Sequence, residues 1–342
     1  MDTSKFISDF KSLNNFYQKM VFKQIKKITL ASDYEQVLKI RGDDLDNKCA
    51  ECPHCESFLY IKFGKSKTGV RRYYCKNCKK GFNEYTGTWI NGLHNKDKIP
   101  EFLKAIELEY SLKKTSEKLE YTRGTAFNWR HKFLSAVEQD EQTNFEGITE
   151  SDEIHFLHSQ KGKKCKHREP RKRGGGHQRG IHDELATVIT VMDRKGNSEF
   201  KFSTMGRISK DDIQNSIGER VTERTILCSD GHSSYQAFTK AKKIEHHVLI
   251  ASKGKRVDGP YHIQHINSLH SYLREFLNLD LRGVSTKYLQ KYLNWKKIKS
   301  KFDDRYDWIK SVLSFSLLQT KAEKIFKNIE KKYLEIFLTT QI

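Results

Sequence analysis

The chain has 342 residues and a formal net charge of +20, with 63 Lys and Arg against 43 Asp and Glu. Its hydrophobic content of 36% suffices for cores in two or three domains, and no stretch approaches the roughly 18 consecutive apolar residues of a membrane helix. The N-terminus lacks the apolar core of a secretory signal, so we expect a soluble, cytoplasmic protein whose basic surface attracts nucleic acid.

The first segment, residues 1–45, is expected to be helical. Phe6, Phe10 and Leu13 recur at helical spacing between lysines. The pattern predicts an accessory helix pair and indicates no function for it.

Residues 46–90 contain two cysteine pairs with the spacing of a zinc ribbon. The pairs read C-P-H-C and C-K-N-C with nineteen residues between them: Cys52, Cys55, Cys75 and Cys78. A tetrahedral Zn²⁺ site needs four ligands, and each C-x2-C turn supplies two thiolates. A disulfide framework is the alternative, but it belongs to small secreted chains. We expect structural Zn²⁺, with Cys49 and His54 as bystanders and Cys165 and Cys228 as free thiols.

Residues 95–140 show the pattern of three short helices, which is the layout of a helix-turn-helix domain. Ala126, Trp129 and Phe133 line one face of the third helix, and Thr122 is placed to cap its start. The other face then offers side chains suited to phosphates and base edges in a major groove: Arg123, Thr125, Asn128, Arg130 and Lys132. A plain three-helix core fragment is the alternative.

Residues 145–300 alternate strands and helices in the order of an RNase H-like α/β domain. Three strands come first, and the second and third are joined by a turn at 193–197. Helix, strand, helix, strand and a long helix follow. The expected strands are 148–157, 185–192, 198–204, 225–228 and 247–251, and a helix is expected at 209–221. A C-terminal helical segment, 301–342, completes a multidomain chain.

Two aspartates are placed for metal-dependent phosphoryl transfer. Asp152 lies on the first expected strand, and Asp230 ends the fourth just before Gly231. Adjacent strands of this fold bring both carboxylates to one point, where their oxygens could hold Mg²⁺. Paired metal ions would activate water or a 3′-hydroxyl. A strand-end Asp is more often a turn or cap residue, so the spacing alone leaves this open.

A basic segment, 160–180, interrupts the domain after the strand that carries Asp152. It has too little apolar surface to fold alone, and a solvated loop is the alternative reading. We favour a loop that contacts DNA beside the aspartates. The residues expected to bind DNA are Lys163, Lys164, Arg171, Lys172 and Arg173.

The order of these modules resembles the DDE-class insertion-sequence transposases of bacteria, above all the insertion-sequence 1595 family. The likeness covers about residues 50–298 and rests on S-D-E-I-H-F, C-S-D-G-H-S-S-Y, N-S-L-H-S and the run 283–295. It implies Asp152 and Asp230 as catalytic acids. The third acid, a Glu in many members, falls on His270, one helical turn after Asn267.

The departure at His270 leaves the identity of the third ligand open. Either His270 or Asn267 could replace the carboxylate, and an imidazole nitrogen suits Mn²⁺ better than Mg²⁺. Glu153 and Glu275 are further candidates for a substitute carboxylate. The sequence does not decide between these residues.

The resemblance implies a nucleoid-associated bacterial DNA transposase. It would bind double-stranded DNA at terminal inverted repeats, cleave the ends with Mg²⁺ or Mn²⁺, and join them to target DNA as a homodimer or higher oligomer. A catalytically inactive, domesticated DNA-binding protein is one alternative, and an RNase H-like structure-selective nuclease is the other. No motif of the sequence indicates the repeat sequence, the target preference or the choice between copying and cutting.

Overall fold

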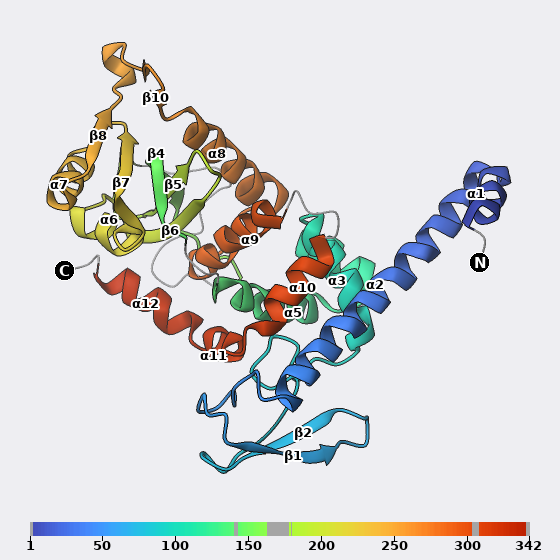
Figure 1. Cartoon of the computed structure of the whole chain (residues 1–342). Helices are drawn as coiled ribbons and strands as arrows, with labels where there is room; N and C mark the ends of the chain where they lie inside the picture. The colour runs from blue at the N-terminus through green and yellow to red at the C-terminus, as the bar shows by residue number, and fades with distance from the viewer. Residues whose placement is uncertain (1–2, 140–142, 163–177, 179, 303–307, 340–342) are drawn as a thin grey trace.

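The structure is a computed structural model that describes residues 3–139, 143–162, 178, 180–302 and 308–339. Three parts are visible in Figure 1: a small ribbon, a central group of helices and an α/β sheet domain. The long helix α2 (Asn15–Asp46) runs from the N-terminal helix α1 (Thr3–Ser12) past the central helices to the ribbon. No helix within these ranges is both long enough and apolar enough to cross a bilayer.

The ribbon is an antiparallel sheet of β1 (Tyr60–Lys65), β2 (Arg71–Cys75) and β3 (Gly81–Asn83). Its small core is aromatic, because the ring of Phe82 lies 5.3 Å from both Tyr60 and Tyr73. Tyr60 also donates its hydroxyl to the carbonyl of Leu45 at 2.9 Å, and Arg71 pairs with Asp43 at 2.9 Å. These contacts fix the end of α2 to the ribbon.

The central helices are α3 (Ile99–Glu107), α4 (Leu112–Leu119) and α5 (Arg123–Ala136). The hydroxyl of Ser111 caps α4, and that of Thr122 caps α5 by accepting the backbone N–H of Thr125 at 3.1 Å. Phe102, Trp129 and Phe133 form the buried contact between α3 and α5. The three helices expected from the sequence are present in this order.

The α/β domain contains a five-stranded mixed sheet in the order β6-β5-β4-β7-β8. Its strands are β4 (Phe145–Leu157), β5 (Leu185–Asp193), β6 (Ser198–Met205), β7 (Val221–Ser229) and β8 (Glu245–Val248). The first three strands are antiparallel, whereas β7 and β8 run parallel to β4. This topology confirms the RNase H-like architecture predicted from the element order.

Side chains of the central strand β4 alternate between two helical layers. Ser151 bonds to the hydroxyl of Tyr235 in α7 (Ser233–Lys242) at 3.2 Å, on the side that α6 (Lys210–Ile217) also covers. Ile154 points to the other side and belongs to the same core as α8 (Gln264–Arg274) and α9 (Leu289–Phe302). Asp152 therefore faces α8.

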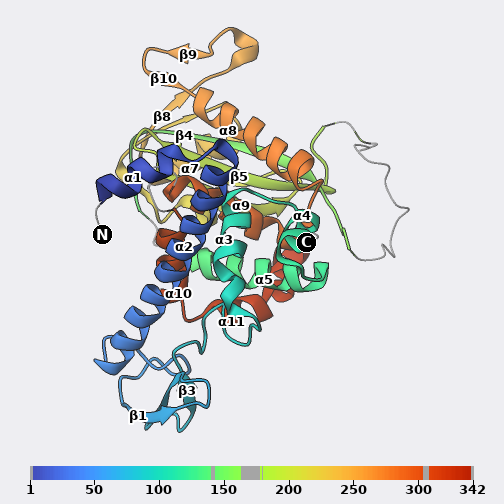
Figure 2. The same ribbon diagram turned by 90° about the vertical axis from the view of Figure 1, so that its right-hand side faces the viewer.

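A small hairpin precedes α8 and projects from the sheet domain in Figure 2. It consists of β9 (Val257–Asp258) and β10 (Tyr261–His262). A π-helical turn, Glu275–Asp280, extends α8 at its other end. Short 3-10 turns occur at Lys96–Lys98, Val137–Gln139, Ala251–Lys253 and Thr286–Tyr288.

Three C-terminal helices join the parts of the molecule: α10 (Trp308–Leu318), α11 (Ala322–Lys327) and α12 (Ile329–Thr339). Trp89, which precedes α3, donates its indole N–H to Ser316 at 3.1 Å. The helix α11 packs on α5, and α12 packs on β6. Tyr333 of α12 also lies 2.9 Å from a ring nitrogen of His158, which follows β4. Figure 1 shows this chain of helices running between the ribbon and the sheet.

Candidate active site and metal sites

The register of the parallel strands brings Asp152 and Asp230 side by side. Glu150 of β4 is the partner of Cys228 in β7, and each aspartate follows its strand partner by two residues. Neighbouring strands lie roughly 4.8 Å apart, so the two carboxylates meet at the same edge of the sheet. The pairing of two strands thus produces the convergence expected from the sequence.

A glycine turn places Asp230 at the end of β7. Gly231 has a φ of +95°, and a Cβ at this position would lie 2.6 Å from Cγ1 of Val248. The turn therefore requires the absence of a side chain. The Asp230 carboxylate accepts the backbone N–H of His232 at 3.0 Å, which orients it at the start of α7.

The Asp152 carboxyl is strongly perturbed. Burial, and then the negative charge of Asp230, raise its pKa to about 7, although the backbone N–H of Glu153 and the charge of Arg274 oppose the shift. Two carboxylates that repel each other in a partly buried position favour either a bound proton or a cation between them. Their hard oxygen atoms fit Mg²⁺ or Mn²⁺.

His270 approaches Asp152 from α8 with one nitrogen free to bind. Its Nε2 lies 2.6 Å from Oγ1 of Thr190, and this hydroxyl donates its hydrogen to the Asp152 carbonyl at 2.8 Å. Thr190 must therefore accept from Nε2–H, which leaves the lone pair on Nδ1. That Nδ1 faces Oδ2 of Asp152 at 3.7 Å. Burial lowers the pKa of His270 to about 4, so the ring is a neutral ligand at pH 7.

The other candidates for the third ligand are placed differently. Asn267 is exposed on the turn of α8 before His270, and Glu275 is exposed at the start of the π-helical turn. Glu153 lies on the face of β4 that carries Ser151, and burial followed by the charge of Asp152 raises its pKa to about 8. A protonated Glu153 is a poor metal ligand, so His270 is the candidate that the fold brings to Asp152.

The four ribbon cysteines form a compact cluster with ligand atoms within 4.8 Å of one another. The Sγ atoms of Cys52 and Cys78 are 3.8 Å apart, and those of Cys55 and Cys75 are 3.6 Å apart. Tetrahedral Zn²⁺ with bonds of about 2.3 Å requires sulfur separations of roughly 3.8 Å. The cluster fits zinc, and Cys49 and His54 lie outside it.

The helix α5 is less exposed than expected for a recognition helix. Arg123 and Asn128 are exposed, whereas Thr125 is half-buried beside Thr122. Arg130, predicted to face DNA, is only 1% exposed, so that prediction is wrong. Its guanidinium donates to the carbonyl of Tyr110 at 2.5 Å and to the Thr115 hydroxyl at 2.9 Å, and it lies 4.8 Å from the ring centre of Trp295.

Of the other basic residues expected to contact DNA, Lys132 lies within the described part of the chain and the five of the basic segment do not. Lys132 is half-buried and donates to the carbonyl of Asn91 at 2.9 Å. The residues of the basic segment expected to bind DNA lie outside the described residues, as does Cys165: Lys163, Lys164, Arg171, Lys172 and Arg173. The start of that segment is tied to the sheet domain, because Thr286 accepts the backbone N–H of Ser159 at 2.8 Å.

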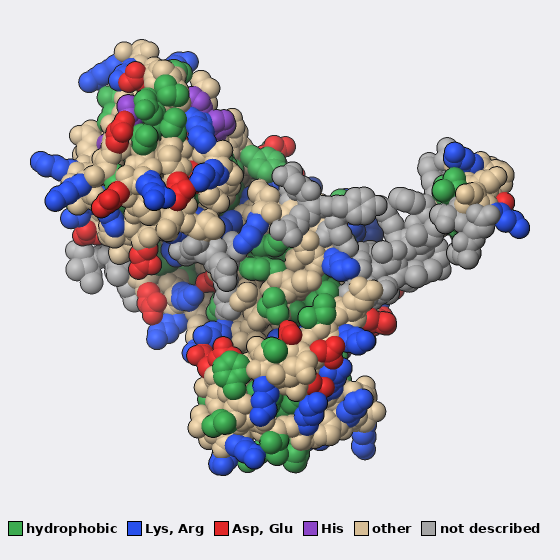
Figure 3. Space-filling model, in the orientation of Figure 1, with side chains coloured by type: hydrophobic (Ala, Val, Ile, Leu, Met, Phe, Trp, Pro, Cys, Tyr) green, Lys and Arg blue, Asp and Glu red, His purple; other side chains and the backbone are tan. Residues whose placement is uncertain are grey.

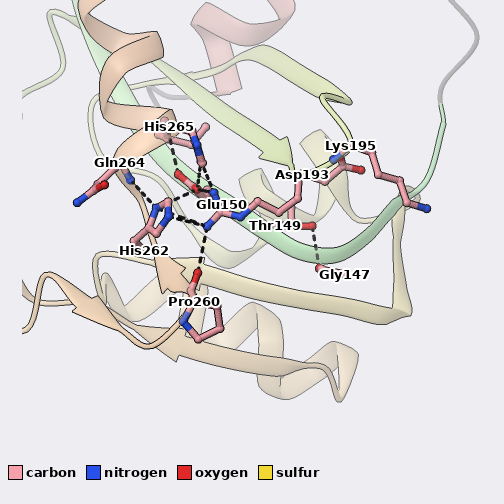
Figure 4. A network of polar contacts seen from close by, with 11 residues as sticks. Gly147, Thr149, Glu150, Asp193, Lys195, Pro260, His262, Gln264 and His265 are labelled. Carbon is pink, nitrogen blue, oxygen red and sulfur yellow. Dashed lines mark hydrogen bonds and ion pairs between the residues drawn. The ribbon is translucent and has the colours of Figure 1, made fainter.

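A second polar cluster beside the aspartates was missed by the sequence analysis. Figure 4 shows His262 and His265 beside Glu150. Arg194 of the β5–β6 turn forms an ion pair with the same carboxylate at 2.5 Å. Within the described residues, His, Cys, Asp or Glu groups of three or more with ligand atoms inside 4.8 Å occur at the cysteines and at Glu150, His262 and His265. The signal in the sequence was a glutamate two residues before Asp152 and the spacing H-x-x-H at 262–265.

Comparison with known proteins identifies a family model for the α/β domain and similar proteins that cover more of the chain. Residues 146–303 match the family model of the ISXO2-like transposase domain. An uncharacterized protein in transposable element ISH50 of Halobacterium salinarum is 25% identical over 247 residues, covering 71% of this chain and 82% of that protein. A pre-cleavage Mos1 transpososome structure is 14% identical, with a TM-score of 0.24, and covers 68% of this chain and 77% of that chain. A score this low carries no structural argument.

Proposed function

Because residues 146–303 belong to the family of ISXO2-like transposase domains, we propose that this transposase cleaves the terminal inverted repeats of its own element and joins their 3′-hydroxyls to target DNA. The observation that carries the proposal is the strand register that sets Asp152 beside Asp230. His270, with Nδ1 at 3.7 Å from Asp152, supplies the third group of the site.

We assign a separate role to each residue of the proposed site. Asp152, Asp230 and the Nδ1 of His270 would hold a divalent ion, Mg²⁺ or Mn²⁺. When bound, such an ion lowers the pKa of a coordinated hydroxyl and neutralises charge on the transferred phosphoryl group. Thr190 fixes the ring of His270 through its hydrogen bond of 2.6 Å. The charge of Arg274, at the end of α8, lowers the pKa of both Asp152 and His270, and we assign its guanidinium to a DNA phosphate.

Binding of double-stranded DNA is assigned to the ribbon, to the exposed start of α5 and to the segment 160–180. Figure 3 shows Lys and Arg side chains over the ribbon end of the molecule. The exposed basic residues of the ribbon are Lys62, Lys65, Lys67, Arg72, Lys76, Lys79 and Lys80. On α5, Arg123 and Asn128 remain available to a groove. The net charge of +20 supports this assignment.

The same proposal implies a structural metal ion, an oligomeric state and a cellular location. Structural Zn²⁺ would hold the ribbon, and two copies or a higher homo-oligomer would hold the two element ends. Such a protein acts in the cytoplasm, in association with the nucleoid of a bacterium. It needs no membrane partner.

One observation favours a second function. The position occupied by a glutamate in many related transposases carries His270, so a sequence-specific DNA-binding protein without chemistry is the competing proposal. It predicts salt-dependent binding to the element ends and no nicking with either metal ion. A structure-selective nuclease would instead cleave branched DNA without joining it.

The test is strand transfer by the full-length protein on oligonucleotides that carry the element end, identified from the DNA flanking the gene. We expect joined products with Mn²⁺ or Mg²⁺, and their loss in Asp152→Asn and Asp230→Asn. Asp211→Asn is the matched control, because Asp211 is 80% exposed in the first turn of α6 and remote from the site. Equal rates in all four proteins would show that the assigned site is wrong.

A further inference from the structure

We infer that Glu150, His262 and His265 form a second metal site, separate from the aspartates, for a transition-metal ion such as Zn²⁺ or Mn²⁺. The three residues come from β4, β10 and the first turn of α8. Their ligand atoms all lie within 4.8 Å of one another. The inference does not depend on the proposed function, because metal binding is measured without DNA.

The geometry centres on one oxygen of Glu150. Its Oε1 lies 3.3 Å from Nδ1 of His262 and 2.7 Å from Nδ1 of His265. Tetrahedral coordination with bonds of about 2.0–2.2 Å separates ligand atoms by roughly 3.4 Å. The first distance already matches, and the second must widen by a fraction of an ångström. His265 can make this movement, because its side chain is 56% exposed.

The surroundings orient both kinds of ligand. The other carboxylate oxygen of Glu150 accepts the backbone N–H of Ile266 at 3.1 Å, which leaves Oε1 directed at the histidines. The backbone N–H of Gln264 points to Nδ1 of His262 at 3.3 Å, so this nitrogen is a hydrogen-bond acceptor in the metal-free ring, and a metal ion must displace the N–H to reach its lone pair. The hydrogen bond from Ile266 orients the Glu150 carboxylate, as the partners of metal ligands do.

The guanidinium of Arg194 already occupies the position between Glu150 and the two histidines. Glu150 is 1% exposed, and a buried carboxylate needs a positive partner. Arg194 supplies it, with Nη1 at 2.5 Å from Oε1 of Glu150 and Nη2 at 3.1 Å from Nε2 of His262. The guanidinium also contacts Nδ1 of His265 and donates to the Pro260 carbonyl at 3.3 Å. Figure 4 shows His262, His265 and Pro260 around the Glu150 carboxylate.

Arg194 and the metal ion are therefore competitors for Glu150. Arg194 belongs to the exposed turn between β5 and β6, and its side chain is 29% exposed, so it can swing into solvent. Its departure leaves one carboxylate and two imidazoles around a vacated position. This competition predicts that removing the guanidinium strengthens metal binding, which a purely structural ion pair would not do.

The ligand set selects the class of ion. Two imidazole nitrogens and one carboxylate suit Zn²⁺, Mn²⁺ or Fe²⁺, whereas Mg²⁺ prefers oxygen ligands. Three protein ligands leave a fourth position for water or a substrate oxygen. The bound ion would tie the β9–β10 hairpin and the start of α8 to β4, two residues or roughly 7 Å from Asp152. It would thus steady the helix that carries His270.

The experiment is a Co²⁺ titration of the full-length protein followed by absorption, with the ribbon first loaded with Zn²⁺. Asp152→Asn and Asp230→Asn are both present to remove the other acidic site. We expect one equivalent of Co²⁺ with d–d bands and no sulfur charge-transfer band. Glu150→Gln or His265→Ala should weaken binding at least tenfold, whereas Arg194→Gln should strengthen it several-fold. His94→Ala, an exposed remote histidine, should change nothing.

Three outcomes would overturn the inference. They are the absence of this equivalent, an affinity unaffected by Glu150→Gln and His265→Ala, and an affinity unchanged or lowered by Arg194→Gln. The Arg194 variant keeps the test decisive if Glu150→Gln disturbs the fold, since it predicts a gain and not a loss. Failure here would leave strand transfer by the aspartates untouched, and failed strand transfer would leave Co²⁺ binding untouched.

Discussion

The Nδ1 of His270 faces the Oδ2 of Asp152 at 3.7 Å, and the ring is held in this position by Thr190. A neutral imidazole lone pair and a carboxylate oxygen are both acceptors, so their approach is unfavourable unless a proton or a metal ion lies between them. The contact between these two side chains therefore gives His270, which stands in the place of a third carboxylate, a chemical role beside Asp152. It also leads to the first prediction.

Thr190→Val removes the hydroxyl that fixes the His270 ring but keeps the shape of the side chain. We expect strand transfer to fall about 10–100-fold, because the loss of a partner of a metal ligand has this effect elsewhere. The apparent affinity for Mn²⁺ should fall in parallel. Thr239→Val, which removes a buried hydroxyl bonded within α7, is the control. A Thr190→Val protein with the wild-type rate and Mn²⁺ dependence would show that Nδ1 is not a ligand.

The two arginines of α5 should have separate effects. Arg130→Met removes buried donors from the Tyr110 carbonyl and the Thr115 hydroxyl, and we expect a loss of about 2–4 kcal/mol in the free energy of unfolding. Arg123→Ala should leave stability within about 0.5 kcal/mol and weaken DNA binding, since Arg123 is exposed. Denaturant unfolding and DNA-binding titrations at fixed salt measure the two effects. If Arg123→Ala binds DNA like the wild type, α5 does not contact it.

Gly231→Ala should disrupt the position of Asp230. The residue has a φ of +95°, and the new methyl group would lie 2.6 Å from Val248. We expect a destabilisation of about 2–4 kcal/mol from the strained backbone and the overlap together, with loss of strand transfer. Gly196→Ala is a matched control, because its φ is +88° and nothing lies within 4 Å of the added Cβ. It should cost only about 1 kcal/mol, and equal costs would refute the argument from contact.

The buried His131 should make the protein sensitive to acid. Burial lowers the pKa of His131 to about 3, so the folded chain keeps it neutral while the unfolded chain binds a proton below pH 6.5. Stability contributed by the neutral ring is therefore full above pH 6.5 and lost as the pH falls, by about 2 kcal/mol at pH 5. The free energies of unfolding of the wild type and His131→Phe, compared at pH 7.5 and pH 5, should differ in slope by this amount. Parallel slopes would show that His131 is protonated in the fold.

Removal of metal should unfold the ribbon before the rest of the chain. The cysteine cluster lies against the small core of Tyr60, Tyr73 and Phe82, which buries too little surface to be stable alone. A chelator or Cys75→Ser should therefore increase amide exchange in residues 46–90 and abolish Zn²⁺ retention. Cys49→Ser should retain one Zn²⁺ per chain, because Cys49 is exposed and outside the cluster. Loss of zinc from that variant would place Cys49 among the ligands.

The sequence predicted the sheet well because each strand has a local signature. The hairpin of β5 and β6 follows from the turn residues between two strand patterns, whereas the approach of Asp152 to Asp230 is left open by their spacing and is favoured by the family resemblance. Boundaries were less certain: a helix was expected to reach Val221, but that residue begins β7, where it pairs with Phe145. The last strand was expected at 247–251 and lies at Glu245–Val248, because its position is set by pairing with β7.

The features that local patterns missed depend on contacts between distant segments. Arg130 lies four residues after Ala126 and three before Phe133, so helical spacing already places it on the buried face of α5, where Trp295 of α9 covers it. The cluster around Glu150 brings that residue to His265, 115 positions later in the chain. The pairing of Glu150 with His265 leaves no mark in a window of neighbouring residues, so only the folded chain shows it, whereas the spacing within α5 already indicated that Arg130 is buried.

The C-terminal helices have a consequence for where DNA would be cut. They connect the ribbon turn at Gly87, the helix α5 and the strand β6, with Glu323 donating its backbone N–H to the Gly87 carbonyl at 3.3 Å. Under the proposed function, these helices then hold the surface that binds the element end at a fixed distance from the carboxylates that cleave it. The number of base pairs between the recognised sequence and the scissile bond would be set by this distance and not by a flexible tether.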